Sequence, residues 1–185
     1  MKRCLDPYRY EHTIGVAYIS VALAMKYGVD LERAEIAGLL HDCAKAYDIQ
    51  TIIQKCEKYN IIVSEEEKQI PQTLHAKLGA FIAMHKFKVT DGEIIRAILN
   101  HTTGKPGMSI LEQIVYVADA IEPGRETTVK LTQIRKNAFE DLDLATYQVL
   151  GYTLEYLKKS GKIIEAMTEK AYDYYKEKIN QSRVN

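Results

Sequence analysis

Disulfide bonds and membrane-spanning segments are the first features that this sequence lacks. Its three cysteines, Cys4, Cys43 and Cys56, are odd in number and form no CxxC pair. A secreted disulfide framework normally has a denser and even set, so reduced thiols are expected. No stretch approaches the roughly 20 apolar residues of a membrane span, and the polar segment 1–10 offers no signal peptide. We therefore expect a cytoplasmic protein that does not associate with a membrane.

Net charge is also absent, because 25 lysines and arginines balance 25 aspartates and glutamates. Such a chain has no general attraction to nucleic acid, which is not expected as a partner, although a local basic cleft is compatible with this balance. The hydrophobic share of 46% is ordinary for a globular protein. No repeat, low-complexity tract or long linker divides the 185 residues. We expect one domain over residues 1–185.

Strand signals are nearly absent, since the only short β-branched run is 61–63. Elsewhere apolar residues recur at helical spacing. Ser64 with Glu67 and Ser109 with Glu112 match the capping box that begins a helix. The pattern predicts an all-α, bundle-like fold of about eight to ten helices. The predicted helices are 12–25, 31–40, 49–56, a short piece after 64, 73–85, 94–101, 110–121, and two within 142–179 that part near 160–161.

Three separate segments place histidine and aspartate beside apolar residues. His12 begins a helical pattern, an apolar run delivers His41 and Asp42 together, and Asp119 interrupts an apolar helix. A buried carboxylate such as Asp119 is costly unless it is paired or bound to metal. Each residue alone is more often a core or capping residue; the ordered combination favours a metal site. Imidazole and carboxylate ligands suit iron, manganese or zinc, and leave positions for water and phosphate oxygens.

Two basic or titratable features lie near these candidate ligands. Arg125 follows the Pro-Gly break after the Asp119 helix, with Glu122 between them. A guanidinium binds oxyanions in bidentate fashion, so Arg125 suits a phosphate. His75 and His101 lie in or beside other helical segments. An imidazole titrates near neutrality, which makes either histidine a natural proton carrier in hydrolysis.

The ordered set of histidines and aspartates resembles the HD superfamily of metal-dependent phosphohydrolases, over roughly residues 12–125. Closer inspection narrows the resemblance to the bacterial YqeK-type family, whose members are symmetrical diadenosine tetraphosphate hydrolases. They carry iron and yield two molecules of ADP. The His-Thr-Thr-Gly and Glu-Pro-Gly-Arg pieces are the specific part. The segments that are similar are 39–45 (LLHDCAK), 100–104 (NHTTG) and 119–125 (DAIEPGR).

This resemblance implies a role for particular residues. The metal would be iron, with manganese or zinc as alternatives, and one or two ions would be bound. The metal-site core would span about 10–126, with helices of about 141–180 packed on it and helix 168–175 near a nucleoside. In the family, this helix carries an aromatic residue paired with an asparagine, and this chain has Asp173 in place of that asparagine. The implied metal ligands are His12, His41, Asp42 and Asp119; the implied catalytic residues are His75, His101 and Asp42; the implied substrate contacts are His75, His101, Thr102 and Arg125.

Several alternatives stay open at this point. Within the superfamily, the same ligand set could serve a nucleotidase or another nucleotide phosphohydrolase. A non-catalytic HD module that binds nucleotide is a second alternative, although no member of the ligand pattern is missing. A third is an α-helical interaction protein whose histidines are incidental. The expected small-molecule partner is a dinucleoside polyphosphate or an ADP-like nucleotide, and a homodimer is an open alternative to a monomer.

Overall fold

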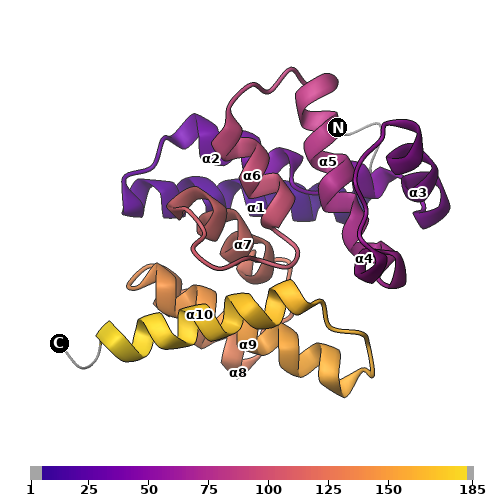
Figure 1. Ribbon diagram of the computed structural model, residues 1–185. Helices are drawn as coiled ribbons and strands as arrows, with labels where there is room; N and C mark the ends of the chain where they lie inside the picture. The colour runs from indigo at the N-terminus through magenta and orange to yellow at the C-terminus, as the bar shows by residue number, and fades with distance from the viewer. Residues whose placement is uncertain (1–5, 183–185) are drawn as a thin grey trace.

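The computed structural model describes residues 6–182, and Cys4 lies outside them. These residues form ten α-helices and two short 3₁₀ helices, with no strand among them (Figure 1). The prediction of an all-α fold is confirmed. The elements are α1 (Pro7–Tyr27), α2 (Leu31–Leu40), η1 (Cys43–Ala46), α3 (Ile49–Lys58), α4 (Glu65–Gln69), η2 (Pro71–Thr73), α5 (Leu74–His85), α6 (Gly92–Asn100), α7 (Ile110–Ile121), α8 (Val129–Ala138), α9 (Leu142–Lys159) and α10 (Ala166–Ser182).

Capping residues determine where most of these helices begin. The two capping boxes expected at Ser64 and Ser109 are both present. The first helix starts earlier than the expected residue 12, because the Asp6 carboxylate accepts the Arg9 backbone N–H and Pro7 occupies the first turn. The additional turn places His12 inside a rigid helix instead of at its frayed end.

Helix α8 is the one α-helix of residues 6–182 that the sequence pattern did not predict, and the two short 3₁₀ helices were not predicted either. Its segment VKLTQIRKNA has few large apolar residues, so its periodicity is weak. Thr128 nevertheless caps it by accepting the Leu131 backbone N–H, and Leu131 and Ile134 are buried. Tertiary packing of this narrow apolar face therefore stabilises a helix that propensity alone does not indicate.

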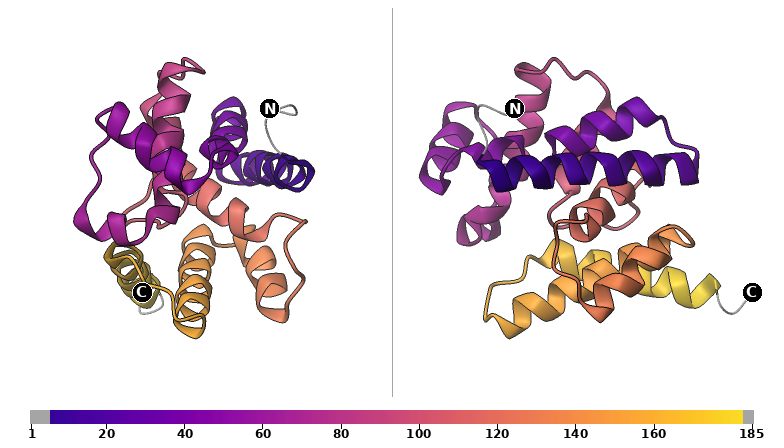
Figure 2. Two further views of the ribbon diagram at one scale, coloured as in Figure 1. Left: turned by 90° about the vertical axis from the view of Figure 1, so that its right-hand side faces the viewer. Right: turned by 180° about the vertical axis from the view of Figure 1, so that it is seen from behind.

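Helix α7 lies at the centre of the molecule, and nine of its 12 residues are buried. It contacts α1, α2 and α6 on one side and α8 and α9 on the other. Figure 1 shows α8, α9 and α10 as a layer below it, and the reverse view in Figure 2 shows α1 running across the molecule above this layer. The main apolar core surrounds α7, while a smaller one lies beneath α3 and α5. The carboxyl end of α7 therefore lies between helices α1, α2 and α6 on one side and the layer of α8, α9 and α10 on the other.

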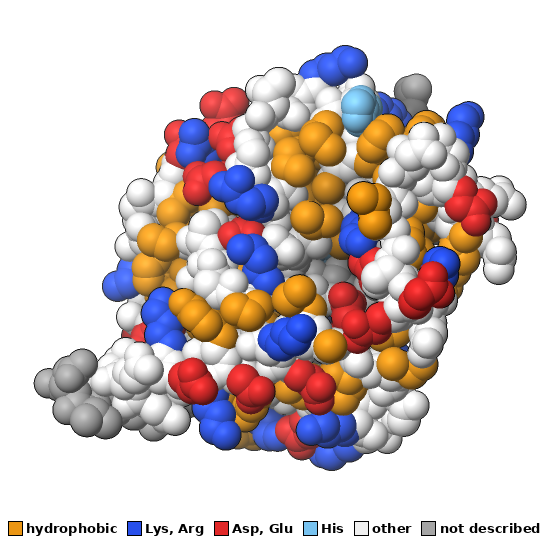
Figure 3. Space-filling model, in the orientation of Figure 1, with side chains coloured by type: hydrophobic (Ala, Val, Ile, Leu, Met, Phe, Trp, Pro, Cys, Tyr) orange, Lys and Arg blue, Asp and Glu red, His pale blue; other side chains and the backbone are white. Residues whose placement is uncertain are grey.

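Surface and thiol chemistry agree with the composition. Acidic and basic side chains are interspersed over the face shown in Figure 3. Cys43 and Cys56 are free thiols. None of the helices in residues 6–182 is long and apolar enough to cross a membrane.

Helix α10 is held to the loop after α6 by a buried hydrogen bond. The backbone N–H of Met108 donates to the hydroxyl of the fully buried Tyr175, at 3.1 Å. Tyr175→Phe leaves this N–H without a partner, so we expect the free energy of unfolding to fall by about 1–3 kcal/mol. Urea denaturation measures the change. The exposed neighbour supplies the control: Tyr174→Phe is expected to leave stability within error, and equal midpoints for the two variants would contradict the assignment.

Candidate metal centre

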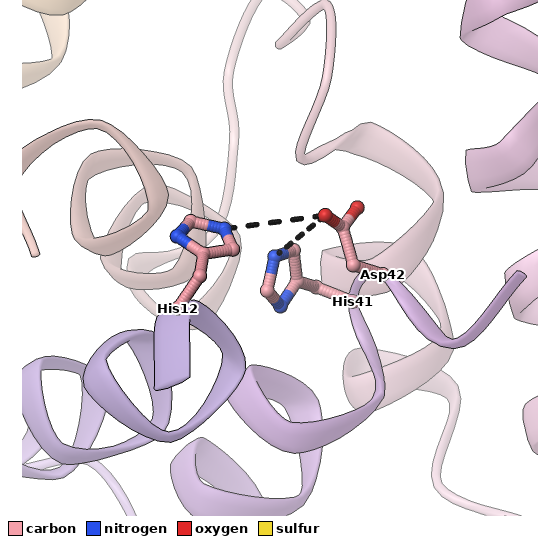
Figure 4. A group of neighbouring side chains, drawn as sticks. All are labelled: His12, His41 and Asp42. Atoms are coloured by element: carbon pink, nitrogen blue, oxygen red, sulfur yellow. Dashed lines mark ion pairs between the residues drawn. The ribbon is translucent and has the colours of Figure 1, made fainter. Parts of the chain in front are cut away.

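The four residues predicted as metal ligands come together from three helices that are distant in sequence. His12 lies on α1, His41 and Asp42 follow α2, and Asp119 lies in the last turns of α7. His12 Nε2 is 3.1 Å from Asp119 Oδ1 and 4.0 Å from Asp42 Oδ2. His41 Nε2 is 3.5 Å from the same Asp42 oxygen and 4.0 Å from Asp119 Oδ1. Figure 4 shows both imidazole rings directed toward the Asp42 carboxylate.

Close contact between α1 and α2 aims the end of α2 at His12. A Cβ atom on Gly38 would lie only 2.8 Å from the Cα of Ala17. Glycine at this position therefore allows the two helix backbones to approach each other, one turn before His41. The adjacent residues His41 and Asp42 can reach the same point because the helix ends between them: His41 caps α2, and Asp42 begins η1.

The second carboxylate oxygen of Asp42 faces another pair of histidines. Asp42 Oδ1 is 3.2 Å from His101 Nε2 and 3.4 Å from His75 Nε2, and the two nitrogens are 3.1 Å apart. The Thr102 hydroxyl lies 3.1 Å from His75 Nε2 and 3.2 Å from His101 Nε2. Asp42 thus stands between two groups of potential ligands, with one oxygen directed toward each.

In all four imidazoles of the cluster, a hydrogen bond at Nδ1 fixes the ring so that Nε2 faces the centre of the cluster. Each Nδ1 lies beside an oxygen that can only accept a hydrogen bond, so each Nδ1 carries a hydrogen and donates it. In the neutral rings every Nε2 then presents a lone pair to the centre of the cluster. The acceptors are Glu122 Oε1 for His12, Gly38 O for His41, Gln72 O for His75 and Ile98 O for His101.

The donor set fits a divalent transition metal. Within residues 6–182 the buried Nε2 of His41 has no hydrogen-bond partner. Lone pairs of neutral imidazoles and carboxylate oxygens repel one another at these separations unless a cation lies between them. Nitrogen and oxygen ligands with an oriented second nitrogen are typical of iron, manganese and zinc sites. The described residues contain three ligand groups that could hold an ion: His12, His41 and Asp42; His41, His101 and Asp119; and Asp42, His75 and His101.

Both carboxylates are charged in this environment. Burial raises the pKa of the Asp42 carboxyl, but the positive charge of a protonated His41 and the contact with His101 lower it by more, to well below its usual range. Burial likewise opposes ionisation of Asp119, but the contact with His12 and the positive charge of a protonated His41 lower its pKa. Burial lowers the pKa of His101 and so favours its neutral form, which is the form that binds metal.

Glu122 is a residue of the site whose role the sequence pattern did not reveal. Its side chain is only 2% exposed. One oxygen accepts from His12 Nδ1 at 3.0 Å, and the other accepts the Gly124 N–H at 2.6 Å. A Cβ on Gly15 or on Gly124 would lie 2.7 or 2.9 Å from that second oxygen, so two glycines make room for the carboxylate. The Glu-Pro-Gly sequence draws attention to Glu122, but it does not identify the partner, because His12 lies 110 residues earlier in the chain.

Arg125 and Lys45 both contact the carboxylates of the cluster. Arg125 Nη2 donates to Asp119 Oδ1 at 2.7 Å, and its Nε donates to the Asp119 backbone carbonyl. Arg125 therefore orients Asp119, and its predicted contact with phosphate stays a prediction. Lys45, which the sequence pattern did not single out, places its Nζ 2.9 Å from Asp42 Oδ2. Cys43 takes no part: its thiol donates to Gly79 O, and burial raises its pKa to about 12.

Two cavities flank the cluster and share one wall. The first, which we call the α10 cavity, has a volume of about 610 Å³ and includes Thr168 of α10 and the segment before it. The second, the α7 cavity, has a volume of about 470 Å³ and includes the carboxyl end of α7. His75 lines the first, and His101, Asp119 and Arg125 line the second. The shared wall consists of Lys45, Thr102, Thr153 and Tyr156.

Comparisons with known proteins agree with this arrangement. Residues 9–124 match the HD domain family model. The chain is 34% identical over 180 residues to the symmetrical bis(5'-nucleosyl)-tetraphosphatase of Bacillus subtilis, covering 94% of this chain and 92% of that protein. It is 36% identical over 177 residues to the protein of the same name from Halalkalibacterium halodurans, covering 94% and 91%.

A solved structure shows the same fold. The crystal structure of an HD superfamily hydrolase from Clostridium acetobutylicum, described as involved in NAD metabolism, has a TM-score of 0.91 and 36% sequence identity. The match covers 95% of this chain and 93% of that one. Since the HD model matches more than half of the chain and these relatives align with nearly all of it, the chain belongs to the HD domain family, in the branch that includes the symmetrical bis(5'-nucleosyl)-tetraphosphatases.

Proposed function

We propose that this chain hydrolyses diadenosine tetraphosphate symmetrically, yielding two molecules of ADP. Two relatives that align with almost the whole chain are named for this reaction. The structural observation that carries the proposal is the set of four imidazole Nε2 atoms around Asp42, between two cavities. The chain functions in this proposal as a single domain, because α9 and α10 help to line the cavities beside the HD region.

The HD family implies a divalent metal, and we propose iron, with manganese and zinc as alternatives. The first ion would be held by His12, His41, Asp42 and Asp119. Asp42, His75 and His101 would hold a second ion or meet the substrate phosphates directly. When bound, the metal neutralises phosphate charge and lowers the pKa of water.

The chain's own residues position the polyphosphate and manage protons. Lys45 and Thr102 lie in the shared wall, where their ammonium and hydroxyl groups can donate to phosphate oxygens. Arg125 keeps the Asp119 carboxylate in place and adds positive charge at the edge of the α7 cavity. His75 and His101 stay the candidates for proton transfer, and their ordered Nδ1 contacts fix the direction in which each Nε2 points.

Atom balance follows from central cleavage. Water adds its oxygen to one of the two inner phosphorus atoms, and the bond from that phosphorus to the central bridging oxygen breaks. The water protons leave to the medium through a base, and both halves depart as ADP. Because the leaving group is itself ADP, charge neutralisation and positioning supply most of the acceleration.

Product analysis tests this proposal. Purified protein loaded with Fe²⁺ or Mn²⁺ is incubated with diadenosine tetraphosphate in ¹⁸O-labelled water, and separately with deoxynucleoside monophosphates. We expect ADP as the only nucleotide product, with one ¹⁸O in one of each two ADP molecules. Formation of AMP with ATP would contradict central cleavage. Phosphate release from the monophosphates alone would identify a nucleotidase instead.

A further inference from the structure

The two cavities have different linings, and the cluster of histidines and aspartates lies between them. Their common wall contains Lys45 and Thr102, which are also the residues that touch Asp42 and the pair His75–His101. Each volume lies within the range of small-molecule sites, about 300–1,000 Å³. Both cavities therefore have the size of a ligand site, and they border different members of the cluster, His75 in the first and His101 and Asp119 in the second.

The α10 cavity contains an acceptor without a donor. Glu165 lies just before α10, and its Oε2 is buried with no hydrogen-bond partner among residues 6–182. A carboxylate that accepts from vicinal hydroxyls is a usual partner of ribose. Apolar walls of Ile70, Leu157 and Ile163 complete the cavity. This side of the cluster thus has the features that one nucleoside requires.

The α7 cavity combines aromatic rings with cations. Tyr8, Tyr152 and Tyr156 line it together with Leu131 and Val149. Nucleobases stack on aromatic rings irrespective of base identity. Arg125 and Lys45 lie on the side of this cavity that faces Asp119 and Asp42. The aromatic and apolar lining can accept a base, while the cations lie where phosphates would enter.

We infer that the α7 cavity is a second nucleoside site, so that a dinucleoside tetraphosphate spans both cavities across the Lys45–Thr102 wall. The inference rests on the proposed function. Central cleavage requires the two inner phosphates to lie at the cluster, so two arms of equal length extend away from it. A cavity on each side of the cluster gives each arm its own site, and each product ADP then occupies one of them.

The number of bound ADP molecules tests the inference without turnover. Titration of ADP into Mn²⁺-loaded protein by calorimetry is expected to give two ADP per chain. Tyr152→Ala removes an aromatic wall of the α7 cavity, and we expect it to weaken one of the two sites by roughly tenfold or more, as loss of a base stack does. Its manganese content stays unchanged. Tyr8→Ala is a second variant with the same expected effect. Because Tyr8 is exposed on the first turn of α1, its replacement does not disturb the packing of the core.

Controls and opposite outcomes separate this inference from the proposed function. Tyr18, which is exposed on α1 and lines neither cavity, supplies the matched control Tyr18→Ala. One ADP per chain in the wild type, or two unchanged sites in both variants, would overturn the second site. If diadenosine tetraphosphate is cleaved to ADP but only one ADP binds, the inference alone fails. If two ADP bind and diadenosine tetraphosphate is not cleaved, the proposed function alone fails.

Discussion

Asp42→Ala is expected to lower the rate of diadenosine tetraphosphate hydrolysis by roughly a thousandfold or more, and to remove most of the bound metal. Among the described residues, Asp42 is the one carboxylate that faces both ligand groups, with Oδ2 toward His12 and His41 and Oδ1 toward His75 and His101. Its loss takes an oxygen and a negative charge from each group. A metal contributes several kcal/mol to the stabilisation of a phosphoryl transition state, and each 1.4 kcal/mol corresponds to about tenfold in rate.

The measurement pairs kcat with metal content of the purified protein by mass spectrometry. Asp42→Asn keeps the shape of the side chain and removes its charge, so an intermediate metal content is expected. Glu177→Ala, at an exposed position of α10, is the matched control and should keep both values. Circular dichroism confirms that each variant is folded. Full hydrolysis by folded Asp42→Ala would place the active site elsewhere in the molecule.

Glu122→Gln is expected to weaken metal binding by roughly tenfold to a hundredfold, in line with the loss of other partners of metal-binding histidines. Glu122 accepts two hydrogen bonds, from the His12 ring and from the Gly124 backbone. Glutamine has one carbonyl oxygen, so its NH₂ group must face one of these two donors. The substitution also removes the negative charge that stabilises the Nδ1–H form of His12 and lies 3.8 Å from Arg125.

Metal titration followed by fluorescence or calorimetry measures this effect, and the stability of the metal-free protein is measured in parallel. Glu169→Gln, an exposed change on α10, is the control. A positioning role predicts weaker metal binding, with the rate restored at high metal concentration. If Glu122→Gln destabilises the metal-free protein but binds metal as tightly as the wild type, then Glu122 only supports the fold.

The geometry of His12 shows why part of the site was accessible from sequence and part was not. His12 begins a helical apolar pattern, the His41-Asp42 pair ends one, and Asp119 interrupts one. These residues could be found from the sequence because such patterns are local. The partner that orients His12 is Glu122, 110 residues further along the chain. No local pattern records this contact, because it exists only when α1 packs against the end of α7. Lys45 differs, because it lies only three residues after Asp42, and the short turn of η1 brings its Nζ back to that carboxylate.

Arg125 shows a different limit. A guanidinium after a Pro-Gly break is suited to phosphate, but the structure places it on Asp119 at 2.7 Å. The sequence cannot distinguish these partners, because a carboxylate and a phosphate offer the same pair of oxygens to an arginine. Only the turn after α7 decides that the carboxylate of the same segment lies within reach.

The sequence alone was sufficient to predict the all-α class, the capping boxes at Ser64 and Ser109, and the order of histidines and aspartates that marks the HD family. These features depend on residue type and short spacing. The tertiary structure decided that α8 forms, that Asp42 directs its two oxygens to two groups, and that two cavities meet at Lys45 and Thr102. These features depend on contacts between helices that are distant along the chain, and such contacts are set by the packing of the whole core around α7.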